Sequence, residues 1–220
     1  MPIYLVSSNP DVKTVADITG KDRIALPEVR TSIQAVTLAM AAEQAFGEGQ
    51  GGRLESISVA MGHPEAMAAL FSGKPDIDAH FSAAPLMYEE LAHPGVHKVL
   101  DSYEVLGGPH TYNAVWTSTR FHDGNPKVYE AFVRALDEAH AGIKADPATA
   151  AALWLKAESV ANMSIFEVEK IIQDPELEWT ATLRKFMAFA KFMNREGILA
   201  NKPDDWRDLF FENAGKLAGD

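Results

Sequence analysis

The amino-acid sequence predicts an α/β fold in which a parallel sheet in the first half is followed by a helical C-terminal segment. Short apolar strand patterns alternate with helical patterns between about residues 23 and 82, and the sequence is helical almost throughout from Pro126. With 220 residues, 47% of them hydrophobic and 23% charged, the chain can bury one sizeable core or two modest ones. We therefore expect an α/β lobe over residues 1–118 and a helical segment over residues 119–220, with a boundary near Thr119.

The elements of the first half are short and separated by turn residues. Strand, helix, strand, helix and strand at this spacing predict parallel β-α-β units with right-handed crossovers. The predicted elements are a strand "RIAL" (Arg23–Leu26), a helix from about Thr31 to Phe46, a flexible loop "GEGQGG" (Gly47–Gly52), a strand "LESISVA" (Leu54–Ala60), a helix "PEAMAALFSG" (Pro64–Gly73) and a strand "DIDAHFS" (Asp76–Ser82).

The remaining elements are mostly helices. After a short helix "PLMYEELAH", the runs "HKVLDSYEVL" and "TYNAVWTS" are rich in strand formers and could return to the same sheet. Two helices are then separated at Asp146-Pro147, a third begins after the N-cap Ser164, and a fourth covers "WTATLRKFMAFAKFMNREG". Within this last helix, the apolar stripe Phe186–Met193 is expected in the core.

Composition and motifs exclude several classes of protein. The formal net charge of -11 argues against a nucleic-acid binder, because such proteins need a basic face. The absence of cysteine excludes disulfides and thiol catalysis. The start of the sequence has no signal-peptide pattern, and no apolar run reaches the length of a membrane span.

No cofactor or metal is expected from the short motifs. His93 and His97 are separated by Pro-Gly, which prevents a shared helical face, and "GEGQGG" follows a helix where a dinucleotide fingerprint would follow a strand. "SGKP" lacks the glycine spacing of a phosphate loop, and no G-x-S-x-G elbow is present.

The loops that leave the predicted parallel strands are the candidate binding site. Ligands collect at the carboxyl ends of such strands, and the unpaired N–H groups of a helix start suit an oxyanion. In "PEVRTS", Thr31 and Ser32 could add hydroxyl donors and Arg30 a charged group. The alternative is that Thr31 or Ser32 is an ordinary N-cap, which is the commonest use of these residues.

Aromatic and histidine residues near the strand ends extend this site. His63, His80, Phe81, His110 and Tyr112 fall in or beside segments that could face one crevice. Taken singly, each is more often a packing residue than a ligand contact. Taken together, they predict a pocket with apolar walls and a few polar donors.

Three segments resemble a known family. These are "SNPDVKTVADITGKDRIALPEVRTS", "AMAALFSGKPDIDAHFSAAP" and "FMNREGILANKPDDWRDLF". They are similar to segments of the ABC-importer solute-binding proteins for nitrate, sulfonates, taurine and thiamine-pyrimidine precursors, which have the type II periplasmic binding fold. The resemblance runs across nearly the whole chain, although no single segment is a strict signature.

The resemblance also implies that part of the family's chain has no counterpart here. Family members usually begin with a signal peptide and about half of a first lobe before the segment that resembles Met1 to Ser8. The resemblance places a complete second lobe in residues 9 to about 112, and the remainder of the first lobe from about Thr119. Family contacts would fall on Arg30, Thr31 and Ser32, on Phe81 and Ser82, and on His110, Thr111 and Tyr112.

The function that the resemblance implies is binding without covalent chemistry. The expected role is capture of a small, anionic solute and its delivery to an ABC permease, in the periplasm. Two alternatives stay open: an enzyme of the same fold that resembles pyrimidine-precursor synthases, and the ligand-sensing domain of a transcription regulator. Because part of a lobe would be missing, exposed apolar surface would favour self-association.

Overall fold

The computed structural model describes residues 1–73, 76–158, 163–217 and 219–220. This part of the chain divides into two compact units. The sheet unit comprises residues 2–112 and 183–220, and the helical unit comprises Met1 and residues 113–182. The C-terminal residues 183–220 therefore pack with the sheet. The boundary predicted near Thr119 refers to the lobes of a two-lobe binding protein and stays a prediction.

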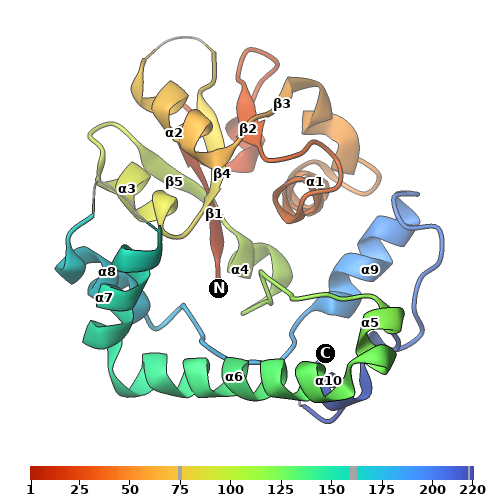
Figure 1. Cartoon of the computed structure of the whole chain (residues 1–220). Coiled ribbons are helices and arrows are strands. Elements are labelled where there is room, and N and C mark those ends of the chain that lie inside the picture. The colour runs from red at the N-terminus through yellow and green to blue at the C-terminus, as the bar shows by residue number, and fades with distance from the viewer. Residues whose placement is uncertain (74–75, 159–162, 218) are drawn as a thin grey trace. The chain divides into compact units, whose positions relative to one another are not determined.

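The sheet has five strands among the described residues, in the order β3-β2-β4-β1-β5 (Figure 1). Strand β2 pairs in parallel with both β3 and β4, so the predicted parallel three-stranded core is confirmed. Strand β1 is antiparallel to both of its neighbours, β4 and β5. The strand bounds are β1 Ile3–Ser7, β2 Ile24–Leu26, β3 Ser58–Ala60, β4 Ala79–Ala83 and β5 His97–Asp101.

Each face of the sheet is covered by its own hydrophobic cluster. One cluster joins the strands to α1 (Ile33–Phe46) and to the 3-10 helices η1 (Val15–Asp17) and η2 (Gly51–Ile57). The other joins them to α2 (His63–Phe71) and α3 (Leu86–Ala92). Because successive strand side chains point to opposite faces, Phe81 belongs to the first cluster, while its neighbours on β4 point toward α2 and α3.

Two predicted strands are wrong in extent or in kind. The segment predicted as one strand over residues 54–60 is a 3-10 helix up to Ile57, and only residues 58–60 form a strand. Leu54 and Ile57 are both buried, and a spacing of three residues places them on one face of a 3-10 helix. "TYNAVWTS" does not return to the sheet. Its Val115 is 69% exposed and its Trp116 is 89% exposed, so strand-forming composition is not accompanied by burial.

The predicted fourth helix begins later than expected. Helix α9 covers Phe186–Arg195, whereas the prediction began at Trp179. The backbone N–H of Lys185 donates to the carboxylate of Asp220, and the N–H of Asp220 donates to the carbonyl of Leu183. The segment before α9 is thus held by the end of the chain, which replaces helical hydrogen bonds. Ala190 and Phe192 are buried, as predicted for the apolar stripe.

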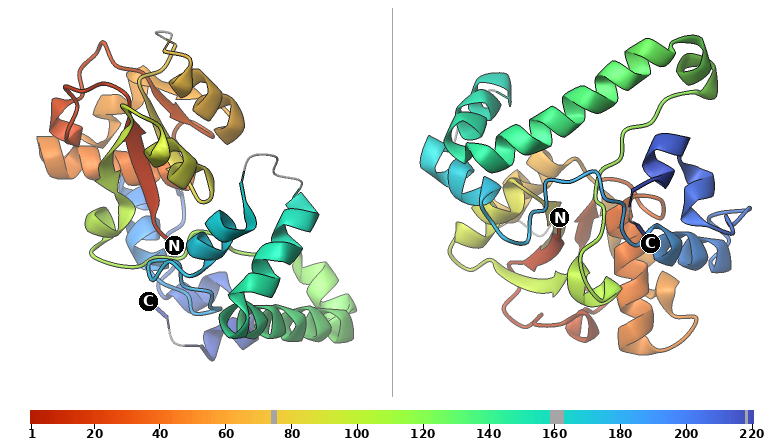
Figure 2. Two further views of the ribbon diagram at one scale, coloured as in Figure 1. Left: turned by 90° about the vertical axis from the view of Figure 1, so that its left-hand side faces the viewer. Right: turned by 90° about the horizontal axis from the view of Figure 1, so that it is seen from below.

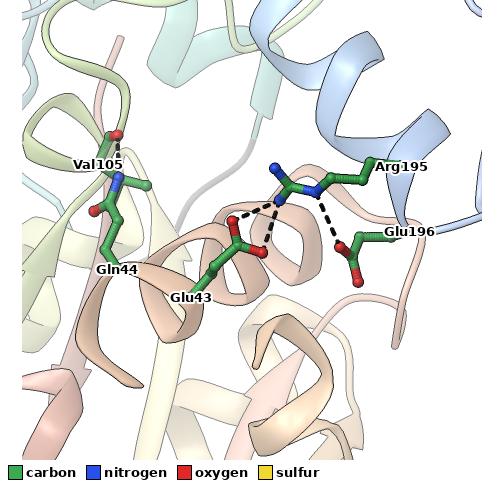
Figure 3. A network of polar contacts seen from close by, with 5 residues as sticks. All are labelled: Glu43, Gln44, Val105, Arg195 and Glu196. Atoms are coloured by element: carbon green, nitrogen blue, oxygen red, sulfur yellow. Dashed lines mark hydrogen bonds and ion pairs between the residues drawn. The ribbon is translucent and has the colours of Figure 1, made fainter. Parts of the chain in front are cut away.

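Polar contacts attach α9 to α1 (Figure 3). The guanidinium of Arg195 donates to both carboxylate oxygens of Glu43, each at 2.7 Å, and its Nε lies 3.4 Å from Glu196. On the next residue of α1, the side-chain amide of Gln44 donates to the carbonyl of Val105 at 2.9 Å. Val105 lies in the short helix α4 (Ser102–Leu106), so α1 is tied to two other elements of the sheet unit. The remaining elements of this unit are η3 (Trp206–Leu209) and α10 (Glu212–Gly215).

The helical unit is built around one long helix. The right view of Figure 2 shows α6 (Pro126–Ala145) as a single rod with α7 (Pro147–Glu158) at its C-terminal end. The predicted break at Asp146-Pro147 is confirmed. Helix α8 (Ile165–Ile172) begins with the predicted capping box, in which Ser164 and Glu167 exchange hydrogen bonds. Helix α5 (Thr119–Gly124) precedes α6.

Candidate functional site

The predicted strand-end loops lie at one edge of the sheet. Strands β2, β3 and β4 are mutually parallel and end at Leu26, Ala60 and Ala83. The loops that follow lead into the N-termini of α1, α2 and α3. The backbone N–H of Met61 donates to the carbonyl of Leu26 at 2.8 Å, which joins the first two loops. This carboxyl edge is the place where parallel α/β sheets collect ligands.

At the start of α1, Ser32 is the N-cap. Its hydroxyl accepts from the N–H of Ala35 at 3.2 Å and donates to the carbonyl of Glu28 at 2.6 Å. Thr31 is exposed. Arg30 has a φ of 81°, in the left-handed region that side chains rarely adopt, and its Nε lies 3.6 Å from the carboxylate of Glu55. The capping alternative for Ser32 is therefore confirmed, and ligand contacts by Arg30, Thr31 and Ser32 stay predictions.

A chain of polar side chains begins at the starts of α1 and α2 and runs into the protein. The side-chain nitrogen of Gln34 lies 3.3 Å from the Tyr112 hydroxyl and 3.3 Å from His63 Nε2. His63 Nδ1 lies 2.8 Å from His80 Nε2, and His80 Nδ1 lies 2.5 Å from Glu90 Oε1. We call these five residues the histidine relay. His80 and Glu90 are fully buried, whereas His63 and Tyr112 are partly exposed.

Burial changes the acidity of both partly exposed groups of the relay. It lowers the pKa of His63 to about 4, assisted by the charge of His80 and opposed by that of Glu90. Burial also raises the pKa of the Tyr112 hydroxyl, against a smaller effect of the hydrogen bond from Gln34. At neutral pH, His63 is therefore an uncharged imidazole and Tyr112 a neutral phenol.

The other predicted residues of β4 lie away from an open surface. Phe81 is fully buried in the core cluster on the α1 face. Ser82 is on the same face as His80 and is fully buried, and its Oγ has no hydrogen-bond partner among the described residues. Ligand contacts by Phe81 and Ser82 stay predictions.

His110 and Thr111 make packing and backbone contacts instead of joining the relay. His110 Nε2 lies 2.8 Å from the Ser102 hydroxyl, and the oxygen of this hydroxyl accepts from the N–H of Ile3. Burial lowers the pKa of His110 to about 4, and the hydrogen bond to the carbonyl of Thr111 opposes this. Thr111 exchanges two hydrogen bonds with the backbone of Arg184, which ties residues 183–220 to the sheet unit.

The structure thus brings together three of the predicted residues, His63, His80 and Tyr112. Sequence reasoning missed their partners Gln34 and Glu90. Glu90 had a weak signal, because the spacing of three residues from Met87 places it on the buried face of α3. Gln34 carried no comparable signal, since a polar residue in the first turn of a helix is ordinary.

A separate pocket of about 70 Å³ lies between α1, η2 and α9 and shares no residue with the histidine relay. A space of this size holds a few water molecules. Its lining includes Leu26, Arg30, Leu38, Glu55, Phe192 and Glu196.

The described part of the chain holds neither a metal-ligand cluster nor a membrane-spanning helix. Among these residues, no group of three histidine or acidic side chains is arranged to hold a metal ion. None of the described helices has the length and apolar character needed to cross a membrane.

Comparison with known proteins supports the predicted fold. No protein family matches the chain, and no curated protein matches it either. Among solved structures, the chain is similar to the periplasmic aliphatic sulphonate binding protein SsuA from Escherichia coli, with a TM-score of 0.61 and 18% sequence identity. The match covers 92% of this chain but 63% of SsuA, so the chain spans less than two thirds of that protein. The predicted α/β fold class is confirmed, and the fold matches that of SsuA.

Proposed function

We propose that the chain is a substrate-binding component of an ABC importer that captures a small solute in the periplasm and delivers it to a membrane permease. The support is the fold, shared with a protein that is named for sulphonate binding over 92% of this chain. The expected solutes are small organic anions or related compounds of the sulfonate, nitrate, taurine or pyrimidine-precursor type.

The observation that carries this proposal is the meeting of Gln34, His63 and Tyr112 at the carboxyl edge of the sheet. These are partly exposed or edge-lying polar groups in a neighbourhood of buried apolar residues, as in small-molecule sites. They come from α1, α2 and the segment after α4, so three separate elements place donors and acceptors within reach of one solute. The start of α2 has no side-chain cap, so the N–H groups of His63 and Glu65 would meet an acidic group of that solute, whereas Pro64 has no N–H.

Binding is tested by titrating the chain with taurine, ethanesulfonate, nitrate and an aminopyrimidine while its unfolding is followed. A solute at about 100 times its dissociation constant stabilises the folded state by roughly 2.7 kcal/mol. The variants Gln34→Ala and Tyr112→Phe should lower the affinity of the chain for the solute. The matched control is His97→Gln, because His97 Nε2 lies 2.7 Å from the carbonyl of Val12, away from the relay. If none of the four solutes stabilises the wild-type chain, the proposed function is wrong for this polypeptide.

One observation favours the enzyme alternative. The buried carboxylate of Glu90 contacts His80, and His80 contacts the partly exposed His63. Such chains orient general bases in enzymes. Mass spectrometry of a bound solute after prolonged incubation separates the two functions: an unchanged mass supports a binding protein, and a new product supports an enzyme. Self-association, also proposed from the sequence, is checked by light scattering.

A further inference from the structure

The inner end of the histidine relay fixes the direction of its hydrogen bonds. Glu90 is fully buried, and its Oε2 has no hydrogen-bond partner among the described residues. When Glu90 is ionised and His80 carries a single ring proton, the carboxylate can only accept, so that proton is on His80 Nδ1 and is shared with Glu90 Oε1. His80 Nε2 is then left as an acceptor for His63.

The outer end gives the same direction independently. The nitrogen of the Gln34 amide can only donate, and its two hydrogens are directed to Tyr112 and to His63 Nε2. His63 Nε2 must therefore accept, so the single proton of the neutral ring is on Nδ1, facing His80. With an ionised Glu90 and an uncharged His80, the inner end agrees with the outer end on one tautomer of both histidines.

This tautomer decides what a solute can offer to His63. In free histidine the proton prefers Nε2, so the opposite tautomer has to be imposed by surrounding groups. With Nδ1 protonated, Nε2 has one lone pair at the partly exposed end of the relay; the Gln34 amide occupies it at 3.3 Å in the solute-free chain, and a solute donor would take the place of that amide. A lone pair attracts an N–H or O–H donor and repels an oxyanion that carries no such group.

We infer that Glu90 and His80 are positioning residues that hold His63 as a hydrogen-bond acceptor, so that the site selects solutes with an N–H donor over otherwise equal solutes without one. This inference rests on the proposed function, because it assigns the class of solute to that same edge. An acidic group elsewhere on the solute is compatible with it, since no side chain caps the start of α2.

The positioning role is tested on the solute-free chain by long-range proton–nitrogen NMR with labelled histidine at neutral pH. We expect a pyridine-type Nε2 and a pyrrole-type Nδ1 for both His63 and His80. His97 is the internal control, because its Nε2 faces a backbone carbonyl and should be protonated. A protonated Nε2 on His63, as would follow if the Gln34 amide were turned over, would overturn the inference.

Two variants test whether the inner residues impose the tautomer. In His80→Asn the amide can still donate to Glu90 but no longer reaches His63, so His63 should shift toward the Nε2-protonated form. Glu90→Gln removes the charge while keeping the shape and should shift His63 in the same direction; it serves also if the first variant does not fold. A His63 tautomer unchanged in the folded variants refutes the positioning role.

The solute class is tested with taurine and ethanesulfonate, which share a sulfonate and differ by an amino group. The wild-type chain should bind taurine about tenfold more tightly, which corresponds to one hydrogen bond with a charged partner. This preference should fall toward one in the folded His80 or Glu90 variant. Equal affinity of the wild-type chain for both solutes contradicts the selection. If neither solute binds, the proposed function and the solute class fail together, while the nitrogen spectra still decide the positioning role.

Discussion

The replacement of His110 by glutamine should remove a large part of the acid sensitivity of the sheet unit. His110 is 2% exposed, and burial lowers its pKa from 6.5 to about 4. Between these two pH values the unfolded chain takes up a proton that the folded chain does not, so stability falls as the pH falls. Above pH 6.5 both states are neutral at this ring, and below pH 4 both are protonated.

The size of the effect follows from that pKa difference. A change from 6.5 to about 4 corresponds to a loss of roughly 3 kcal/mol on complete acidification. This is a large share of the roughly 5–15 kcal/mol that stabilises a typical domain. The Oε1 of a glutamine side chain can take the place of His110 Nε2 as the acceptor of the Ser102 hydroxyl, so the variant should keep this hydrogen bond and lose the titration.

The assay is urea unfolding at pH 7 and pH 4.5, followed through the amide NMR signals of Leu5 and Phe81 in the sheet. The wild-type chain should lose stability from both His110 and His63, whose pKa is also lowered to about 4. His110→Gln should lose about 2–3 kcal/mol less than the wild type over this interval. Equal losses in the two chains would refute the assignment of acid sensitivity to His110.

Three other sets of substitutions test particular contacts. Gly219→Ala should cost about 1–3 kcal/mol in urea unfolding, because the new Cβ would lie 2.8 Å from the carbonyl oxygen of Leu183, whereas the control Gly20→Ala has nothing within 4 Å and should not destabilise. Ser32→Ala should cost about 1 kcal/mol through loss of the α1 cap, and exposed Thr31→Ala should stay within about 0.5 kcal/mol of the wild type; equal costs would contradict the capping role. Arg195 and Glu43, changed singly and together to alanine, should give a coupling energy of about 0.2–1 kcal/mol, because the arginine side chain is 50% exposed; zero coupling would show that the pair does not hold α9.

The arrangement of the parallel strands could be predicted because its signals are local. The helix over residues 63–71 has proline near its start, and the strands on either side of it are short apolar runs, so one β-α-β unit follows from neighbouring residues. Strand β1 was not predicted. Its five residues are buried on both faces, so no alternation distinguishes it, and its antiparallel partners lie at residues 79–83 and 97–101, far along the chain.

The sequence predicted several residues of the candidate site, but it did not predict which side chains contact one another there. His63 and His80 were expected near strand ends, and they meet because β4 lies beside the start of α2. The role of Glu90 depends on how α3 is rotated against the sheet, which the sequence specifies only through the burial of Met87. Arg30 was expected at the helix start, but its backbone conformation and its contact with Glu55 on η2 are properties of the tertiary structure.

The position of the histidine relay is difficult to explain by stability alone. Glu90 and His80 are both fully buried beside an apolar cluster that includes Met87 and Leu70, and one carboxylate oxygen of Glu90 has no partner among the described residues. Taking such groups out of water costs several kcal/mol, and apolar side chains of the same volume often stabilise a protein as well or better. A network that only filled space would have no reason to end at the carboxyl edge, with His63 and Tyr112 partly exposed at the helix starts. The energetic cost and the placement together are the physical reason for proposing that the relay belongs to a binding site and does more than fill the core.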